Sequence, residues 1–248
     1  MSTELMSQKE NSSLSITGHL EELQKRLWTV IATIAVASVA GFYLSDHLIE
    51  WLKRPAGDTL PKLSFFSPAE AVIAYLKVAL VFGVIVSLPV ILYELWAFIR
   101  PGLTARERRY GLSFVFWGSL LFLAGVAFAY RILLPPSLAF LIGFGSRTLQ
   151  PVISINHYLS FTSTVILACG VVFEFPLVIF FLTKLGLVTP QKLRGNWKMA
   201  FLGMVIVAAA VTPTQDPINL ILMTVPLLLL YEISIVVSVF ASRRRKDV

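Results

Sequence analysis

The sequence predicts an all-α, polytopic integral membrane protein whose six transmembrane helices form one bundle. The chain has 248 residues, of which 56% are hydrophobic and only 14% are charged, whereas soluble domains carry about 25% charged residues. Apolar runs long enough to cross a bilayer also follow one another along the chain with short connections. These connections leave no room for a soluble domain, so we expect a single membrane domain over residues 1–248.

Six apolar runs fit the length of about 20 residues that a crossing helix needs. The predicted spans are residues 27–45, 71–98, 111–134, 158–184, 198–212 and 217–240, between a polar segment 1–26 and a basic tail 241–248. The fifth run has only 13 uninterrupted apolar residues, or about 20 Å of helix against a hydrocarbon core of about 30 Å. It therefore either crosses a locally thinned bilayer or forms a re-entrant hairpin with the sixth.

The distribution of lysine and arginine predicts the orientation. The chain has a net charge of +7, and its cations flank the apolar runs, which favours a role in topology over nucleic-acid binding. Three cations precede the first span and four lie in each of 99–110, 184–198 and the tail, whereas five lie on the opposite side. The positive-inside rule then places both termini in the cytoplasm and makes the fifth run a true crossing.

The motifs that the sequence lacks argue against an enzyme. We find no phosphate-binding GxxxxGK[ST] loop, no HExxH and no GxSxG. The three histidines are too scattered for an obvious metal site, and the single cysteine, Cys169, lies inside an apolar run. We therefore expect no catalytic site, no cofactor and no metal.

Several residues predict where helices begin and bend. SPAE at 67–70 combines a serine cap, a proline at the first helical position and a glutamate three residues after the cap, which is a capping box at the start of the second span. Thr189 before Pro190 similarly predicts a helix start. Prolines at 89, 176 and 226 lie inside spans and predict bent helices. Lys77 is expected to extend toward the membrane interface.

Two charged segments lie at the predicted cytoplasmic ends of spans. GHLEELQKRL at 18–27 is amphipathic, and Glu22 and Arg26 are spaced to form an ion pair on one helix face. YELWAFIRPGLTARERRY at 93–110 places an aromatic cluster before a loop with four arginines, among which Glu107 is a lone carboxylate. An interfacial anchor and local charge pairing are the simpler interpretations of the two segments.

GVVFEFPLVIF at 170–180 places Glu174 in the middle of a membrane span, where a charged carboxylate is costly. Helical spacing puts Ser160, Ser163 and Gly170 on the same face, so this face either packs inside the bundle or lines a cavity or a partner site. A neutral glutamate bonded to a neighbouring helix is the structural alternative. Asp216, in the turn VTPTQDP, is equally compatible with a simple helix cap.

Five of these segments, in this order, resemble the TatC family, the polytopic core of the twin-arginine protein translocase. They are HLEELQKRL, FFSPAEA, LYELWAFIRPGL followed by ERR, VFEFPLV, and VTPTQDP followed by LLYE. The resemblance implies a cup-shaped, six-helix protein in the bacterial inner membrane that recognises signal peptides with paired arginines. It also implies that folded proteins are moved by the proton-motive force, without a nucleotide.

The resemblance implies a peptide site at the cytoplasmic surface. In the family the matching carboxylates bind the twin arginines, which suits the planar guanidinium because it can bond a carboxylate through two N–H groups. Phe98 and Pro101 match positions near that surface, and Arg26 and Arg109 are expected to orient the carboxylates. The implied signal-peptide-binding residues are Glu22, Glu107, Phe98, Pro101, Arg26 and Arg109.

The resemblance also implies partners within the membrane. TatA- and TatB-type single-span proteins are expected to dock near spans five and six, with Glu174, Thr212 and Asp216 as intramembrane polar contacts, and a homo-oligomer is expected within the receptor complex. Gln24 and Leu220 depart from the residues that are usual in the family.

An ion- or proton-coupled small-solute secondary transporter is the alternative function. Glu174, Lys77 and the proline-bent helices motivate it, because ionisable residues inside a membrane often mark an ion pathway.

Overall fold

The computed structural model describes residues 2–59, 63–102, 108–144, 152–184, 186–211 and 217–246, and these ranges are almost entirely helical. The α-helices are α1 (Ser2–Tyr43), α2 (Ser45–Lys53), α3 (Pro68–Ile99), α4 (Gly111–Phe128), α5 (Leu134–Gly143), α6 (Ile155–Phe173), α7 (Phe175–Lys184), α8 (Pro190–Gly195), α9 (Trp197–Val211) and α10 (Pro217–Lys246). Short turns of other helix types are η1 (Arg54–Thr59), η2 (Arg100–Gly102), η3 (Arg108–Tyr110) and η4 (Ala129–Leu133). No β-strand forms within the described ranges.

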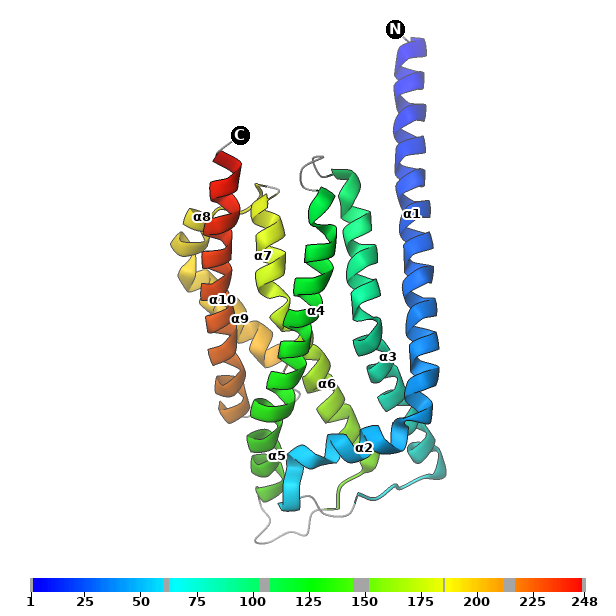
Figure 1. Cartoon of the computed structure of the whole chain (residues 1–248), viewed down its shortest axis with the longest axis vertical. Coiled ribbons are helices and arrows are strands. Elements are labelled where there is room, and N and C mark those ends of the chain that lie inside the picture. Colours follow the sequence, from blue (N-terminus) through cyan, green and yellow to red (C-terminus); the bar gives the residue numbers. More distant parts are fainter. Residues whose placement is uncertain are drawn as a thin grey trace.

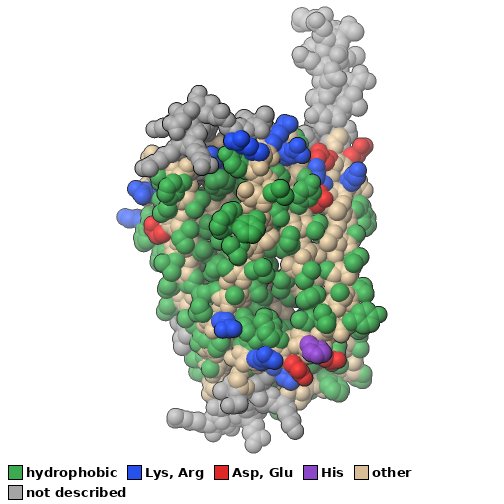
Figure 2. Space-filling view, viewed as in Figure 1, with side chains coloured by type: hydrophobic (Ala, Val, Ile, Leu, Met, Phe, Trp, Pro, Cys, Tyr) green, Lys and Arg blue, Asp and Glu red, His purple; other side chains and the backbone are tan. Residues whose placement is uncertain are grey.

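Long apolar helices confirm the predicted fold class of six membrane crossings. Five helical stretches are long and apolar enough to span: Leu20–Tyr43, Pro68–Ile99, Arg108–Gly143, Ile155–Lys184 and Leu220–Phe240. A shorter apolar helix, Trp197–Ala210, supplies the sixth. Figure 1 shows these helices side by side, and Figure 2 shows a hydrophobic band between two ends that carry charged side chains.

Helix α1 stands at one edge of the bundle and packs along α3 (Figure 1). Glycines allow this close approach, because a Cβ on Gly41 would lie 2.9 Å from the Ala79 carbonyl oxygen and one on Gly83 would overlap the Ser38 hydroxyl. Only 6% of the most apolar 18-residue stretch of Leu20–Tyr43 in α1 is buried. This helix therefore exposes most of its surface to its surroundings and depends on α3 for its position.

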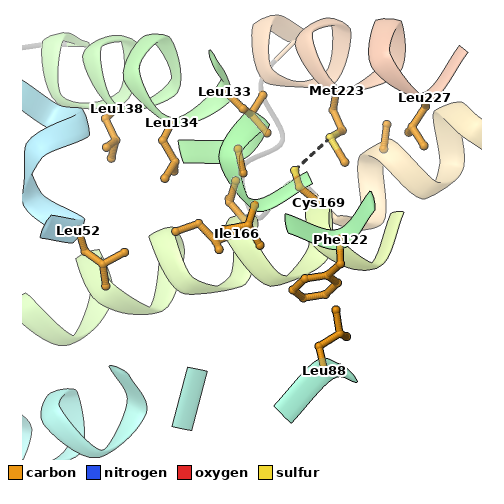
Figure 3. Close-up of a cluster of buried hydrophobic side chains, with 14 of the residues drawn as sticks. Leu52, Leu88, Phe122, Leu133, Leu134, Leu138, Ile166, Cys169, Met223 and Leu227 are labelled. Atoms are coloured by element: carbon orange, nitrogen blue, oxygen red, sulfur yellow. Dashed lines mark hydrogen bonds between the residues drawn. The ribbon is translucent and has the colours of Figure 1, made fainter. Parts of the chain in front are cut away.

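The bundle core lies between α3, α4, α6 and α10, as Figure 3 shows for part of it. Gly170 on α6 lies directly against the ring of Phe122 on α4, and Figure 3 shows that ring pointing toward Leu88 of α3. The buried thiol of Cys169 lies 3.7 Å from the sulfur of Met223 on α10. Small residues on α6 thus let bulky side chains from three other helices meet.

Helix α2 lies across the end of the bundle that is opposite the termini (Figure 1). Two tyrosine hydroxyls hold it there: Tyr130 donates to the Trp51 carbonyl at 2.9 Å and Tyr158 donates to the Leu52 carbonyl at 2.8 Å. The rings of Trp51 and Tyr130 also stack at 3.9 Å. The sequence analysis predicts no helix in this connection, because nine residues are too short for a clear periodic signal.

The predicted capping box at the start of α3 is confirmed, with one difference in its partners. The Ser67 hydroxyl accepts the Glu70 N–H at 3.3 Å, but the Glu70 carboxylate reaches back one residue further, to the Phe66 N–H at 2.6 Å. Its other oxygen accepts the hydroxyl of Ser154, just before α6. The cap therefore also ties α3 to α6.

The half-buried Lys77 side chain is bound by α6. The Lys77 Nζ donates to the Asn156 Oδ1 at 2.7 Å and to the Ser160 Oγ at 2.6 Å, and Asn156 is the second residue of α6. Two polar partners on a neighbouring helix satisfy the charge, and its extension to the membrane interface stays a prediction. Ser160 is therefore used for packing between α3 and α6.

The three prolines inside predicted spans differ in their setting. Pro89 and Pro226 lie inside continuous helices, α3 and α10, where a bend stays a prediction. The helix before Pro176 stops instead, and Glu174 separates α6 from α7. The Thr189 cap is confirmed, since its hydroxyl accepts the Lys192 N–H at 3.3 Å, but the short helix α8 ends before α9 begins.

Candidate functional site

The end of the bundle near both termini brings together α1, the end of α3 and the beginning of α4 (Figure 1). Figure 2 shows lysine and arginine side chains gathered at this end, above the hydrophobic band. Most of the residues that the sequence predicts for peptide binding belong to these three helices and to the turns between α3 and α4. We call this region the basic end.

A carboxylate–guanidinium–carboxylate cluster joins α1 to α3 at the basic end. The Arg26 Nη2 lies 2.5 Å from the Glu22 Oε1, which confirms the predicted pair, and the Arg26 Nη1 lies 2.9 Å from the Glu94 Oε2 on α3. The side chains are 24% exposed for Arg26, 35% for Glu22 and 15% for Glu94. We call these three residues the arginine-bridged cluster.

The cluster has one negative charge in excess. The two Arg26 nitrogens that contact Glu22 share its Oε1, at 3.2 Å and 2.5 Å. Within the described ranges, the Glu22 Oε2 receives none of these bonds, and it belongs to the most exposed member of the cluster. A further guanidinium from outside the chain would meet a net negative, partly exposed carboxylate here.

Glu94 is the site residue that the sequence analysis missed. It lies inside the motif LYELWAFIRPGL, in which the aromatic residues and the arginines that follow are the more prominent features. The available signal was a carboxylate within the apolar second half of α3, the same anomaly that draws attention to Glu174. Its partner was not predictable, because it depends on how α1 packs against α3.

Phe98 and Pro101 lie near the end of α3 and leave an apolar surface beside the cluster. Phe98 is 37% exposed, and Pro101 is exposed in the η2 turn. The Arg108 guanidinium lies 3.5 Å from the Pro101 carbonyl oxygen, so the η3 turn closes back onto η2.

The Arg109 guanidinium lies over the Tyr110 ring, 5.6 Å from its centre, and makes no ion pair with a described carboxylate. Glu107 lies outside the described residues.

Beneath these turns an aromatic group fixes α3, α4 and α7 relative to one another. The Trp96 ring lies 5.4 Å from that of Phe114 and 5.1 Å from that of Phe181, and the last two lie 4.7 Å apart. Trp96 is only 4% exposed. The end of α3 that carries Glu94 therefore rests on close aromatic packing.

Glu174 lies in the membrane-spanning part of the bundle, between α6 and α7. Its backbone N–H bonds to the Val171 carbonyl at 3.1 Å, and its own carbonyl accepts the N–H groups of Leu177 at 2.9 Å and Val178 at 3.0 Å. Both carboxylate oxygens are buried and have no hydrogen-bond partner among the described residues. The alternative of a glutamate bonded to a neighbouring helix therefore finds no partner in that part of the chain.

The surroundings of Glu174 show where its carboxylate points. A Cβ added to Gly118 on α4 would lie 3.3 Å from the Glu174 Oε2, so the side chain faces α4 across a glycine. Ser163, on the same face of α6, is also buried without a partner in the described ranges. Thr212 and Asp216 lie outside the described residues. No group of three potential metal ligands occurs in the part of the chain that was searched.

The fold and the basic end together define a class, a polytopic helical membrane protein with a cluster of charged side chains at one end. A model of the family "Sec-independent protein translocase protein (TatC)" matches residues 18–226. The chain is 40% identical to a TatC of Listeria innocua, over 94% of each chain, and 36% identical to a TatC of Aquifex aeolicus, over 95% of this chain and 99% of the other. This chain belongs to the TatC family.

A solved structure supports the same conclusion at the level of the fold. The crystal structure of a twin-arginine translocase receptor TatC superposes with a TM-score of 0.78 and 36% identity, over 90% of this chain and 99% of the other. The chain is therefore a multi-pass membrane component of a Sec-independent protein translocase. It is not an enzyme, and the comparisons do not support the small-solute transporter.

Proposed function

We propose that this chain is the receptor for twin-arginine signal peptides and the assembly core of its translocase. The observation that carries the proposal is the arginine-bridged cluster, which has an excess negative charge and a partly exposed Glu22. Most of the basic end repels a cationic peptide, so a net negative site within it selects the position at which paired arginines bind. The translocase moves folded proteins across the energised inner membrane without a nucleotide.

The two arginines of the peptide meet different carboxylates in this proposal. Glu22 binds one guanidinium through the oxygen that Arg26 does not contact, and Glu107 binds the other by its family position. Arg26 holds Glu22 in place while Arg109 restrains the loop that carries Glu107. Phe98 and Pro101 form the apolar wall against which the residues beside the arginine pair pack.

The orientation follows from the charges. The predicted topology leaves 15 of the 21 lysines and arginines on the side of both termini, and the positive-inside rule then places the N- and C-termini in the cytoplasm. The peptide site then faces the compartment in which precursor proteins fold. All 248 residues form one membrane domain in this proposal.

Partner proteins bind at a second location, inside the bilayer. Helix α9 has 15 residues, or about 22 Å of helix, which is short for a core of about 30 Å. The thinner region beside α9 and α10 favours docking of TatA- and TatB-type single-span helices, with Thr212 and Asp216 at its edge and Glu174 as a deeper polar contact. Further copies of this chain complete the receptor complex.

Crosslinking of a signal peptide to the purified full-length protein tests the proposal. A photoreactive group beside the arginine pair should label residues near 19–27 and 98–109, and a peptide with two lysines in place of the arginines should label them about tenfold less. The matched lysine peptide keeps the two positive charges and removes only the planar guanidinium groups. Equal labelling by both peptides would contradict a carboxylate–guanidinium receptor.

A further inference from the structure

An apolar cleft of about 400 Å³ opens between α4, α7 and α10 at the basic end. Its volume is within the range of about 300–1,000 Å³ of small-molecule sites. Phe114 and Phe181, held by the buried Trp96, belong to its wall, and Ile233 and Val237 supply the side that α10 contributes. The walls of the cleft are therefore formed by three packed helices and not by a loop.

The cleft runs along the membrane normal for about one leaflet. From Tyr110 in η3 to Leu121 on α4 its lining covers about 16 Å of helix, or roughly half of a hydrocarbon core of about 30 Å. On α7 the lining runs from Pro176 to Phe181, within the last third of the membrane-spanning stretch Ile155–Lys184. Because the lining covers only about half of the core thickness, it is too short to hold a helix that crosses the bilayer.

Two cations stand at the mouth of the cleft, each against an aromatic ring that lines it. The Arg109 guanidinium lies 5.6 Å from the centre of the Tyr110 ring, and the Lys184 ammonium lies 6.0 Å from the centre of the Phe180 ring. Neither cation forms a salt bridge with a carboxylate in the ranges that the structure describes. The mouth is thus positive while the interior is apolar.

We propose that this cleft binds one anionic glycerophospholipid, with its phosphate between Arg109 and Lys184 and an acyl chain along α4 and α7. Basic pockets between transmembrane helices are known to suit anionic headgroups, and the aromatic rings at the mouth suit the depth of the headgroups. Charge complementarity selects a lipid over an apolar partner helix, and the one-leaflet length supports the same choice. The lipid fills the space between α4 and α10 and so stiffens the basic end.

Native mass spectrometry of the full-length protein from vesicles of equal dioleoyl-phosphatidylglycerol and dioleoyl-phosphatidylcholine tests the headgroup contact. We expect the protein to retain phosphatidylglycerol in preference, and Lys184→Gln to lower the ratio of the two lipids about fivefold, as the loss of one cation near a lipid surface predicts. Lys192→Gln, an exposed lysine at the same end, is the matched control and should leave the ratio unchanged. Equal retention of both lipids, or equal effects of the two substitutions, would overturn the proposal.

The acyl chain has its own test, which does not depend on the charges. Val237→Trp fills the cleft and should reduce retention of both lipids, whereas Val236→Trp, at an exposed neighbouring position outside the lining, should not. A phosphatidylglycerol with a photoreactive acyl chain should label Trp117 or Leu121. Labelling confined to other faces, or cleft residues that crosslink to a single-span partner helix and not to lipid, would overturn the proposal.

Discussion

Glu22 on α1 and Glu174 between α6 and α7 are both carboxylates of this bundle, but their surroundings are opposite. Glu22 lies at the basic end, is 35% exposed, and shares a guanidinium with Glu94. Glu174 faces Gly118 with both oxygens buried and no partner in the described ranges. A partly exposed carboxylate held by a cation can bind a cationic peptide, whereas one buried without a partner suits a contact inside the membrane.

Arg26→Ala should produce the largest effect, because it breaks the cluster that defines the first region. Without the cation, Glu22 and Glu94 face each other as like charges, and Glu94 is only 15% exposed. Removal of one partner of a buried ion pair costs about 3–5 kcal/mol, and partial exposure of this cluster lowers our expectation to about 2–3 kcal/mol of unfolding free energy. Denaturation of the purified protein in detergent measures the change.

Lys25→Ala is the matched control, since Lys25 is an exposed neighbour on the same helix. It should change the unfolding free energy by less than about 0.5 kcal/mol, as surface substitutions usually do. The double substitution Arg26→Ala with Glu94→Ala should recover part of the loss, because it also removes the stranded buried carboxylate. A loss for the double variant equal to the sum of both single losses would show that the two residues do not interact.

The second-largest effect should distinguish the roles of Glu22 and Glu94 in peptide binding and in stability. Glu22→Gln should weaken binding of a twin-arginine peptide about tenfold, since a charge-assisted hydrogen bond contributes about 1.5–3 kcal/mol and part of it remains with the amide. Glu94→Gln should weaken binding less and stability more, because Glu94 is the more buried residue and holds α1 on α3. Isothermal titration and denaturation of the same two variants measure both quantities.

A reversed order would break the distinction that we draw within the cluster. If Glu94→Gln abolished binding while Glu22→Gln left it unchanged, the peptide would bind Glu94 on α3. Glu22 would then serve only to hold Arg26 in position. Repetition at high salt sharpens the result, because the exposed Glu22 contact is screened more strongly than the buried Glu94 contact.

The sequence predicts interactions within one helix far better than those between helices. The Glu22–Arg26 pair and the Ser67 cap depend on spacing along the chain, and both are present. The Arg26–Glu94 and Lys77–Ser160 contacts join residues on different helices. They depend on the close approach of α1 to α3 at Gly41 and Gly83 and on the register of α3 against α6, which no local pattern specifies.

The same limit explains helix α2 and the setting of Glu174. The nine residues of α2 are held across the bundle by hydroxyls from Tyr130 and Tyr158, which are distant in sequence. The sequence predicts a bend near Pro176 and a polar face on the helix. It does not predict that Gly118 on α4 faces the carboxylate, because that contact arises only when α4 packs on α6 and α7.

Glu174→Gln should have the smallest effect on peptide binding and completes the comparison. The amide keeps the shape of the side chain, lies away from the basic end, and should change the affinity for a twin-arginine peptide by less than about twofold. Stability should change by less than about 1 kcal/mol, since the amide is nearly isosteric with the carboxyl group and leaves a buried polar group at the same place. Transport of a folded precursor and crosslinks to single-span partners should nevertheless change, because the polar contact inside the membrane is altered. Loss of peptide binding with transport otherwise intact would place recognition at Glu174 and remove the division between the two regions.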